Sequence, residues 1–297
     1  MKIWILVKKE NFHNYENSKY REVAREQEID LEFREPEKFE LIVTRDDKKS
    51  ILYDGHEVQL PDVLIPRMGA NTAYFSLAII RHLERLGVLV LNSSHSIETA
   101  KDKLAVMQIL AASNLPIPKT MLAKFPINLE VVDREFTYPL IVKTVSGVAG
   151  KGVFLCENRA QFVDLTNLME ISRDSKVNVI IQEFISSSRG KDIRVYVVGG
   201  RPIAAMLRTA REGNFKANYS AGGDVAPFQL NPQVEWLAVE SARLINLDIA
   251  GVDILFDGEG YKICEVNSSP GFEGFEKATG LNVPREVFNY LRVRISG

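Results

Sequence analysis

Two neighbouring segments near the C-terminus constrain the fold most, because apolar and polar residues alternate along both of them. They are residues 250–256 and 261–267, and residues 257–260 between them (Asp-Gly-Glu-Gly) are typical of a turn. If the last three turn residues form the loop, Asp253 lies directly opposite Glu265, with the two Cβ atoms about 5 Å apart. The pattern therefore predicts a hairpin in which two carboxylates face each other.

A third oxygen ligand belongs to the same face, since Asn267 follows Glu265 by two residues. Two opposed carboxylates in a largely apolar ribbon repel each other, and desolvation penalises both charges. A bound cation removes both costs. Ligands of oxygen alone, with coordination sites left open, suit Mg²⁺ or Mn²⁺ holding a polyphosphate. The alternative is an ordinary hairpin whose two acids face solvent.

Composition limits the class of protein. The chain has 297 residues, of which 45% are hydrophobic and 26% charged, which indicates a globular protein of about two domains. A formal net charge of -2 offers no basic face for nucleic acid. No apolar run approaches the roughly 20 residues of a membrane span. Residues 1–7 are typical of a strand rather than of a signal peptide, so we expect a cytoplasmic protein.

The cysteines and histidines do not suggest a metal or redox site. Cys156 and Cys264 both lie in apolar strand patterns and are predicted to be buried thiols. The four histidines show no ligand spacing and are interpreted as structural or surface residues: His13, His56, His82 and His95.

The first third of the chain alternates strand and helix, which predicts a small parallel sheet of the doubly wound type. The expected strands are residues 2–7, 41–44, 51–53, 62–67 and 88–92, and the expected helices are 19–27 and 74–86. No glycine-rich turn follows the first strand, so a dinucleotide site is excluded. Arg67 ends a strand and could face a substrate across a cleft, although an arginine in such a place is more often a surface residue.

The middle of the chain predicts a phosphate flap. Residues 94–114 form a helical connector with Asp102-Lys103 in its middle. Beyond it, a strand (140–143), a glycine-rich loop (146–152) and a strand (153–156) follow one another, and glycines let backbone N–H groups approach an anion closely. The loop is not a Walker A motif, because glycine and then a strand follow its lysine. A simple glycine-rich hairpin turn has the same composition.

Lys143 closes an apolar strand, where a lysine needs a partner for its charge. A triphosphate would supply that partner, and the alternative is a salt bridge to an acid on a neighbouring strand. Residues 179–185 form a buried strand whose abrupt end could hold an adenine by backbone hydrogen bonds. A hairpin of residues 192–198 and 202–208 then turns at Gly199-Gly200, and an amphipathic helix (232–247) leads back to the C-terminal hairpin.

The order of these residues resembles the ATP-grasp superfamily, and within it the chain is similar to the RimK-type α-L-glutamate ligases, which add glutamate to the C-terminus of ribosomal protein S6. The resemblance spans essentially the whole chain. It is carried by Asp102-Lys103, Lys143, the glycine flap, Gln182-Glu183-Phe184-Ile185, Gly190-Lys191-Asp192-Ile193-Arg194, Arg208, Asn218, Gly222-Gly223, Gly251-Val252-Asp253 and Glu265-Val266-Asn267-Ser268-Ser269-Pro270-Gly271.

Two segments depart from the RimK pattern. Residues 146–151 stand where RimK proteins commonly carry an acid and a glutamine, and Leu207-Arg208-Thr209 stands where they usually show adjacent charged residues. Close relatives use the same scaffold on N-acetylaspartate, citrate and other small carboxylates. Since both segments lie near the expected substrates, they leave the identity of the acceptor open.

The resemblance implies an α/β N-terminal domain followed by an ATP-grasp unit of two α+β lobes that clamp ATP. The expected divisions are a pre-ATP-grasp domain (residues 1–98), a central lid lobe (99–185) and a C-terminal lobe (186–297). ATP would be bound by Lys103, Lys143, Gly147, Gly150, Gly152, Gln182, Glu183, Phe184, Ile185, Asp192, Lys216 and Asn218. Two Mg²⁺ (or Mn²⁺) ions would be held by Asp253, Glu265 and Asn267. Arg208 would stabilise an acyl phosphate, and Asn218 would fix the transferred group.

The activity implied is that of an ATP-dependent carboxylate–amine ligase. Its expected substrates are L-glutamate or another amino acid and, as acceptor, a protein C-terminus or glutamate peptide. A homo-oligomer (dimer or tetramer) is expected. The alternatives are a ligase acting on a small carboxylate, a small-molecule kinase on the same fold, and a non-catalytic nucleotide sensor. The metal-binding trio together with Arg208 argues against a sensor, since binding ATP alone does not require all four residues.

Overall fold

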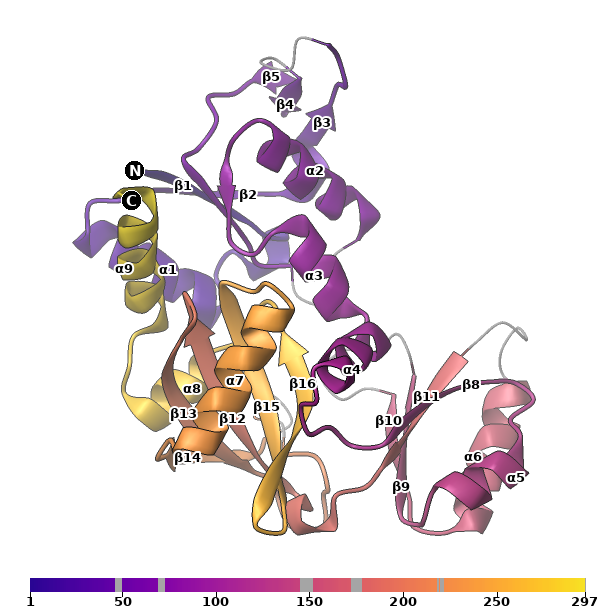
Figure 1. The fold of residues 1–297 in the computed structure, drawn as a ribbon. Helices are drawn as coiled ribbons and strands as arrows, with labels where there is room; N and C mark the ends of the chain where they lie inside the picture. Colours follow the sequence, from indigo (N-terminus) through magenta and orange to yellow (C-terminus); the bar gives the residue numbers. More distant parts are fainter. Residues whose placement is uncertain are drawn as a thin grey trace.

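The computed structural model describes residues 1–45, 50–68, 73–144, 152–171, 178–217, 219 and 222–296, and Figure 1 shows its course. The helices are α1 (Tyr15–Glu26), α2 (Tyr74–Arg85), α3 (Ser94–Lys101), α4 (Lys103–Ala112), α5 (Leu129–Glu135), α6 (Arg159–Ile171), α7 (Pro232–Leu244), α8 (Glu273–Thr279) and α9 (Val283–Ser296). The strands are β1 (Lys2–Leu6), β2 (Asp30–Arg34), β3 (Phe39–Leu41), β4 (Ile51–Tyr53), β5 (His56–Glu57), β6 (Val63–Pro66), β7 (Leu89–Val90), β8 (Thr120–Lys124), β9 (Leu140–Thr144), β10 (Val153–Cys156), β11 (Asn178–Glu183), β12 (Lys191–Val198), β13 (Arg201–Thr209), β14 (Asp224–Phe228), β15 (Ile249–Asp257) and β16 (Gly260–Asn267). No helix in these described ranges is long and apolar enough to cross a membrane.

The N-terminal sheet is parallel, with strand order β2-β1-β6-β7, as its βα alternation predicts. Four consecutive residues of β1 are buried, which is typical of a parallel strand covered on both faces. The prediction of a strand over residues 41–44 in the parallel sheet is wrong in two respects. The strand is β3, which ends at Leu41, and it pairs antiparallel with β4 in a separate sheet of order β3-β4-β5.

The predicted helical connector is not continuous. Asp102 leaves the helical conformation (ψ 98°), and its Oδ1 accepts hydrogen bonds of 3.0 Å from the N–H groups of Leu104 and Ala105. An aspartate that caps a new helix in this way ends the previous one, so α3 and α4 are separate helices. Val106, Met107 and Leu110 of α4 pack into the core formed by α7 and the C-terminal sheet. Lys103, in the first turn of α4, is therefore supported by the C-terminal lobe.

The central lobe is an antiparallel sheet of order β10-β9-β11-β8. Helices α5 and α6 cover its outer face, where Val132 and Phe162 pack against Leu140, Val142 and Ile181 (Figure 1). The alternate residues of β9 and β11 point toward the C-terminal lobe instead. This arrangement leaves one face of the central sheet available to a site between the lobes.

The C-terminal lobe is a five-stranded antiparallel sheet of order β14-β13-β12-β15-β16, with α7 packed on one face. The chain then returns to its beginning, because α9 lies against α1 (Figure 1). Tyr20 of α1 contacts the rings of Phe272 (5.8 Å between centroids) and Phe288 (5.6 Å). The N-terminal domain and the C-terminal lobe therefore share one hydrophobic core, which the pattern of local elements did not predict.

The β15–β16 hairpin confirms the opposed carboxylates but not the loop from which they were predicted. Asp257 pairs with Gly260, so the loop has two residues rather than three. The register shifts by one residue at Cys264, which forms a β-bulge, and beyond it Asp253 pairs directly with Glu265. The bulge compensates for the shorter loop and restores the predicted pair.

Candidate active site

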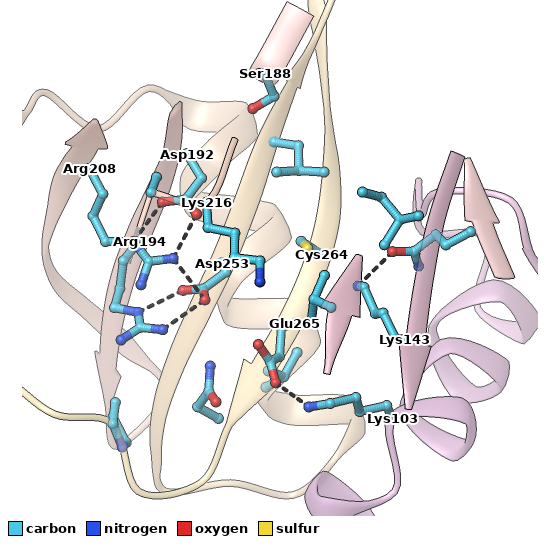
Figure 2. A pocket seen from close by; sticks show the side chains of 18 of the residues that line it. Lys103, Lys143, Ser188, Asp192, Arg194, Arg208, Lys216, Asp253, Cys264 and Glu265 are labelled. Carbon is cyan, nitrogen blue, oxygen red and sulfur yellow. Dashed lines mark hydrogen bonds and ion pairs between the residues drawn. The ribbon is translucent and has the colours of Figure 1, made fainter. Parts of the chain in front are cut away.

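A cavity of about 530 Å³ lies between the central sheet and the C-terminal sheet. Figure 2 shows how side chains of both lobes point into it. Lys143 and Gln182 come from the central sheet, and Asp253 and Glu265 come from the C-terminal hairpin. Residues more than 100 positions apart in the chain therefore line one enclosed space.

Four functional side chains lie on one face of the C-terminal sheet because of strand register. Arg194 on β12 pairs with Asp253 on β15, which pairs with Glu265 on β16. Asn267 follows Glu265 by two residues and therefore lies on the same face. The three predicted oxygen ligands are thus brought together, and Arg194 joins them from the neighbouring strand.

Asp253 is bound by two arginines. Arg194 donates from Nε and Nη2 to the two carboxylate oxygens at 2.6 and 2.7 Å, and Nη2 of Arg208 lies 2.9 Å from Oδ2. Arg208 also donates two hydrogen bonds to the carboxylate of Asp192, from Nε at 2.6 Å and from Nη2 at 2.7 Å (Figure 2). With 4% exposure for Asp253 and 2% for Arg208, this network is shielded from water and its electrostatic interactions are strong.

For both aspartates of this network, burial raises the pKa of the carboxyl group and the neighbouring arginines lower it. Burial raises the pKa of Asp253, but Arg194 and Arg208 outweigh that effect and hold it at about 2. Burial also raises the pKa of Asp192, and there the attraction of Arg208 does not fully compensate, because the negative charge of Asp253 lies nearby. Asp253 is therefore an anion throughout the neutral range.

Lys143 has a neutral partner rather than an acid. Its Nζ donates to Oε1 of Gln182 at 2.7 Å, which is the dashed line drawn from Lys143 in Figure 2. Nε2 of Gln182 donates to Oγ1 of Thr120 at 2.8 Å. Within the described part of the chain, no carboxylate lies within 4 Å of the Lys143 ammonium. The alternative of a salt bridge to an acid on a neighbouring strand is therefore wrong for these residues, and the ammonium faces the cavity without a counter-charge.

The remaining ATP-site candidates are distributed along the cavity wall. Lys103 Nζ lies 2.6 Å from Oε1 of Glu265, which joins α4 to the hairpin. The carboxylate of Glu183 binds the Lys262 ammonium and accepts from the backbone N–H of Lys119. Glu183 lines the cavity together with Phe184 and Ile185, which follow β11 directly.

Most predicted site residues line the cavity: Lys103, Lys143, Gln182, Glu183, Phe184, Ile185, Asp192, Arg208, Lys216, Asp253, Glu265 and Asn267. Gly152 is described but packs beside Thr144, where a Cβ would come within 2.3 Å of the threonine Oγ1. Gly147, Gly150 and Asn218 lie outside the described residues. Cys264 is only half-buried and lines the cavity, because the bulge turns it out of the apolar pattern that predicted a buried thiol.

Arg194 and Glu16 are among the lining residues that sequence reasoning did not assign to the site. Arg194 follows Asp192 by two residues, so strand alternation already places both on one face. Glu16 of α1 also lines the cavity, and no local pattern in the N-terminal domain signals this. Arg67 is not among the lining residues. Its Nη1 donates to the carbonyl of Pro270 at 3.0 Å, so it supports the loop after β16.

The oxygen ligands fit a hard divalent cation. Asp253 and Glu265 supply carboxylates and Asn267 an amide oxygen, all on one face of the sheet. Elsewhere in the described ranges, no cluster of three or more His, Cys, Asp or Glu residues offers a metal site. The carboxylate oxygens are neutralised here by Arg194, Arg208 and Lys103. A divalent ion would therefore compete with these basic side chains for the same oxygens.

Comparison with known proteins agrees with this geometry. The family model described as the RimK-like ATP-grasp domain matches residues 100–291, and the RimK PreATP-grasp domain matches residues 1–97. The chain belongs to the RimK-like ATP-grasp family. As a member of that family it has an N-terminal pre-ATP-grasp domain followed by an ATP-grasp domain, as the sequence predicts.

Similar proteins include a "Probable alpha-L-glutamate ligase" of Legionella pneumophila (strain Corby), 38% identical over 231 residues, which are 77% of this chain and 76% of that protein. A protein of the same name in Vibrio vulnificus (strain YJ016) is 35% identical over 98% of this chain and 95% of its own length. Among solved structures, the ATP-grasp ligase PsnB complexed with minimal precursor superposes with a TM-score of 0.77 at 20% identity, covering 99% of each chain. A D-alanine–D-alanine ligase from Bacillus anthracis superposes with a TM-score of 0.65 at 16% identity, covering 100% of this chain and 99% of its own. These likenesses establish the ATP-grasp fold.

Proposed function

We propose that the protein is an ATP-dependent carboxylate–amine ligase that forms an amide bond through an acyl phosphate. The observation that carries the proposal is the charge arrangement across the cavity. The Lys143 ammonium has no acid within 4 Å in the described part of the chain, while Asp253, Glu265 and Asn267 stand on the opposite wall. A magnesium-bound triphosphate would satisfy both walls at once, its phosphates on the lysine side and its cation on the carboxylates.

Each residue has a role in this reaction. Lys103 and Lys143 bind phosphate oxygens, and the backbone of Glu183, Phe184 and Ile185 meets the adenine edge. Two Mg²⁺ ions would be held by Asp253, Glu265 and Asn267. When bound, such ions neutralise the charge of the phosphoryl group as it moves to the acceptor carboxylate.

Arg208 and Arg194 stabilise the anion that develops at the acceptor. Both guanidinium groups are fixed by carboxylates on the sheet, so their donors are oriented before substrate binds. The uncharged amine then attacks the acyl carbon, and phosphate departs with one oxygen of the original carboxylate and with the proton that the amine loses. A kinase would leave the phosphoryl group on its acceptor, and a nucleotide sensor would make no product.

The names of the relatives favour L-glutamate as the amine. We propose a protein or peptide C-terminus ending in glutamate as the acceptor, with a small carboxylate as the second candidate. The acceptor brings an anion into the cavity, and its wall there carries the donor groups of Arg194, Arg208 and Lys216.

Isotope transfer tests the reaction. A glutamate-terminated peptide labelled with ¹⁸O in its terminal carboxylate is incubated with ATP, Mg²⁺ and L-glutamate. We expect ADP, an amide product and ¹⁸O in inorganic phosphate, and hydroxylamine in place of glutamate should give a hydroxamate. Unlabelled phosphate beside a genuine amide product would exclude an acyl phosphate. Phosphate retained on the acceptor would identify a kinase.

A further inference from the structure

We propose that Glu16 binds the ammonium group of the incoming amino acid, which releases a proton before its amine attacks, and thereby selects amino acids over uncharged nucleophiles. This inference rests on the ligase activity proposed above and adds a subsite to it. Glu16 belongs to the N-terminal domain, in the first turn of α1 after the cap residue Asn14, yet it lines the cavity between the ATP-grasp lobes. The subsite therefore lies where the two parts of the molecule meet.

The position of Glu16 is fixed by the loop that follows the metal-ligand strand. Its Oε1 accepts a hydrogen bond of 3.3 Å from the backbone N–H of Phe272, and a Cβ at Gly271 would come within 3.2 Å of the same oxygen. A residue larger than glycine would crowd the carboxylate. The loop, residues 268–272, follows Asn267 directly, and Glu16 lines the same cavity as the metal-ligand candidates.

Arg67 holds this loop from the N-terminal domain. Its Nη1 donates to the carbonyl of Pro270 at 3.0 Å, and its guanidinium lies 5.5 Å from the centroid of the Phe272 ring. The hydroxyl of Tyr15, next to Glu16, donates to Oε2 of Glu276 at 2.7 Å. These contacts hold the loop and the start of α1 in place, and the Glu16 carboxylate joins the two segments through its hydrogen bond with Phe272.

The charge around Glu16 differs from that in the rest of the cavity. In the ranges that the structure describes, no lysine or arginine nitrogen lies within 4 Å of Glu16 or of Glu273, the other acid at this end. By contrast, Glu265 pairs with Lys103, and Asp253 pairs with Arg194. The cavity therefore has a phosphate-binding end, where carboxylates pair with basic side chains, and an acidic end, where Glu16 and Glu273 have no basic side chain within 4 Å in the described ranges.

An amino-acid ammonium fits the acidic end better than the other reactants do. The acceptor carboxylate and the phosphates are anions, which Glu16 repels. An ammonium carries three donors and a full positive charge, and a charge-assisted hydrogen bond to a carboxylate is among the stronger ones. Two acids alone are a poor set of ligands for a divalent metal, which leaves the amine as the cation of the reaction that this end attracts.

Binding measurements test the subsite without turnover. L-glutamate and glutarate, which lacks the ammonium, are titrated by calorimetry into the protein held with a non-hydrolysable ATP analogue and Mg²⁺. We expect the wild type to bind glutamate about ten-fold more tightly than glutarate, and Glu16→Gln, which keeps the acceptor for Phe272, to lose that preference. Glu16→Asp should restore part of it. The matched control is Glu22→Gln, on the same helix, whose carboxylate pairs with Lys19 at 2.8 Å and does not line the cavity.

Turnover supplies the second readout. Hydroxylamine is uncharged at neutral pH, so Glu16→Gln should raise KM for glutamate about ten-fold while hydroxamate formation and KM for ATP stay within about two-fold of wild type. Equal binding of glutamate and glutarate by the wild type, or a preference that survives in Glu16→Gln, would overturn the proposal. So would an equal loss of amide and hydroxamate in a folded Glu16→Gln protein. A wild type that prefers glutamate but forms no hydroxamate would refute the ligase chemistry and leave the ammonium subsite standing.

Discussion

Arg194 and Asp253 face each other on adjacent antiparallel strands, and two hydrogen bonds of 2.6 and 2.7 Å join the guanidinium to the carboxylate. Arg208 reaches the same carboxylate at 2.9 Å. Asp253 therefore binds two arginines, one of which is also bound by Asp192, and it is the proposed metal ligand at the centre of the sheet. We expect a divalent ion to bind by replacing part of this arginine contact, so that stability and metal binding depend on the same carboxylate.

Asp253→Asn should destabilise the fold as well as abolish Mg²⁺-dependent ADP release. The substitution leaves Arg194 without its carboxylate partner and Arg208 with Asp192 alone, and breaking a buried pair in this way costs about 3–5 kcal/mol of unfolding free energy. Urea unfolding measures the loss. The matched control is Asp257→Asn, on the same strand, whose side chain is 42% exposed and lies 3.3 Å from Lys262. It should change the unfolding free energy by about 1 kcal/mol or less. Equal effects of the two variants would contradict the proposed importance of the buried network.

The same carboxylate predicts a pH dependence of stability. Burial raises the pKa of Asp253, but Arg194 and Arg208 hold it at about 2 in the folded protein, below the value of about 3.9 for an unfolded aspartate. Between these values the unfolded chain binds a proton that the folded protein does not. The unfolding free energy therefore falls as pH is lowered from about 4 to about 2, by about 2–3 kcal/mol for this group.

The raised pKa of Asp192 has the opposite sign, because the folded protein takes up that proton first and is stabilised by it in acid. The charge of Asp253 contributes to that shift, so the difference between wild type and Asp253→Asn reports the ionised carboxylate together with its effect on Asp192. Unfolding free energies of wild type and Asp253→Asn, measured from pH 7 to pH 2, should converge below about pH 4. A constant difference across that range would show that the ionised carboxylate does not stabilise the fold.

Glu265→Gln should remove Mg²⁺-dependent turnover and leave the fold intact. Glu265 is the more accessible of the opposed acids, with a side chain that is 39% exposed, and its pair with Lys103 is partly solvated. The amide keeps the volume of the side chain but not the charge that a metal ion requires. ADP release over a Mg²⁺ titration, together with the thermal midpoint, checks both parts. Glu259→Gln in the turn of the same hairpin is the control and should behave as wild type, since Glu259 is exposed and does not line the cavity.

The hairpin shows what a sequence can and cannot specify. Alternation and the family motif predict that Asp253 faces Glu265, and the register confirms it. The predicted loop length was wrong because the bulge at Cys264 depends on backbone hydrogen bonding, which cannot be inferred from the alternation of apolar residues. Asp102 is a similar case. Helical spacing continues through it, yet its side chain caps a new helix, so a local polar contact overrides the pattern.

Contacts between distant parts of the chain were the least predictable. Arg194 could have been found, because it shares a strand face with Asp192 and that alternation is visible in the sequence. Glu16 could not, since its place in the cavity depends on how α1 packs against the loop at Gly271 and Phe272. The same packing creates the core shared by the N-terminal domain and the C-terminal lobe, and no local period encodes it.

The last prediction concerns the uncompensated charge of Lys143. Its ammonium donates to the neutral amide oxygen of Gln182 at 2.7 Å, and if phosphate is its partner, an acid placed there should compete with ATP. Gln182→Glu supplies that acid at constant volume, and Lys143→Met removes the charge. Each should weaken the binding of ATP by about ten-fold, and the double variant should be little weaker than either one, because both act on one interaction. Binding is measured by calorimetry with a non-hydrolysable ATP analogue, and adenosine, which lacks phosphates, should bind each variant as it binds wild type. If Lys143 serves only the fold, Gln182→Glu should stabilise the protein through a new ion pair and leave ATP affinity unchanged. A parallel loss of adenosine binding would instead show that Gln182 contacts the base and that the charge of Lys143 does not decide nucleotide affinity.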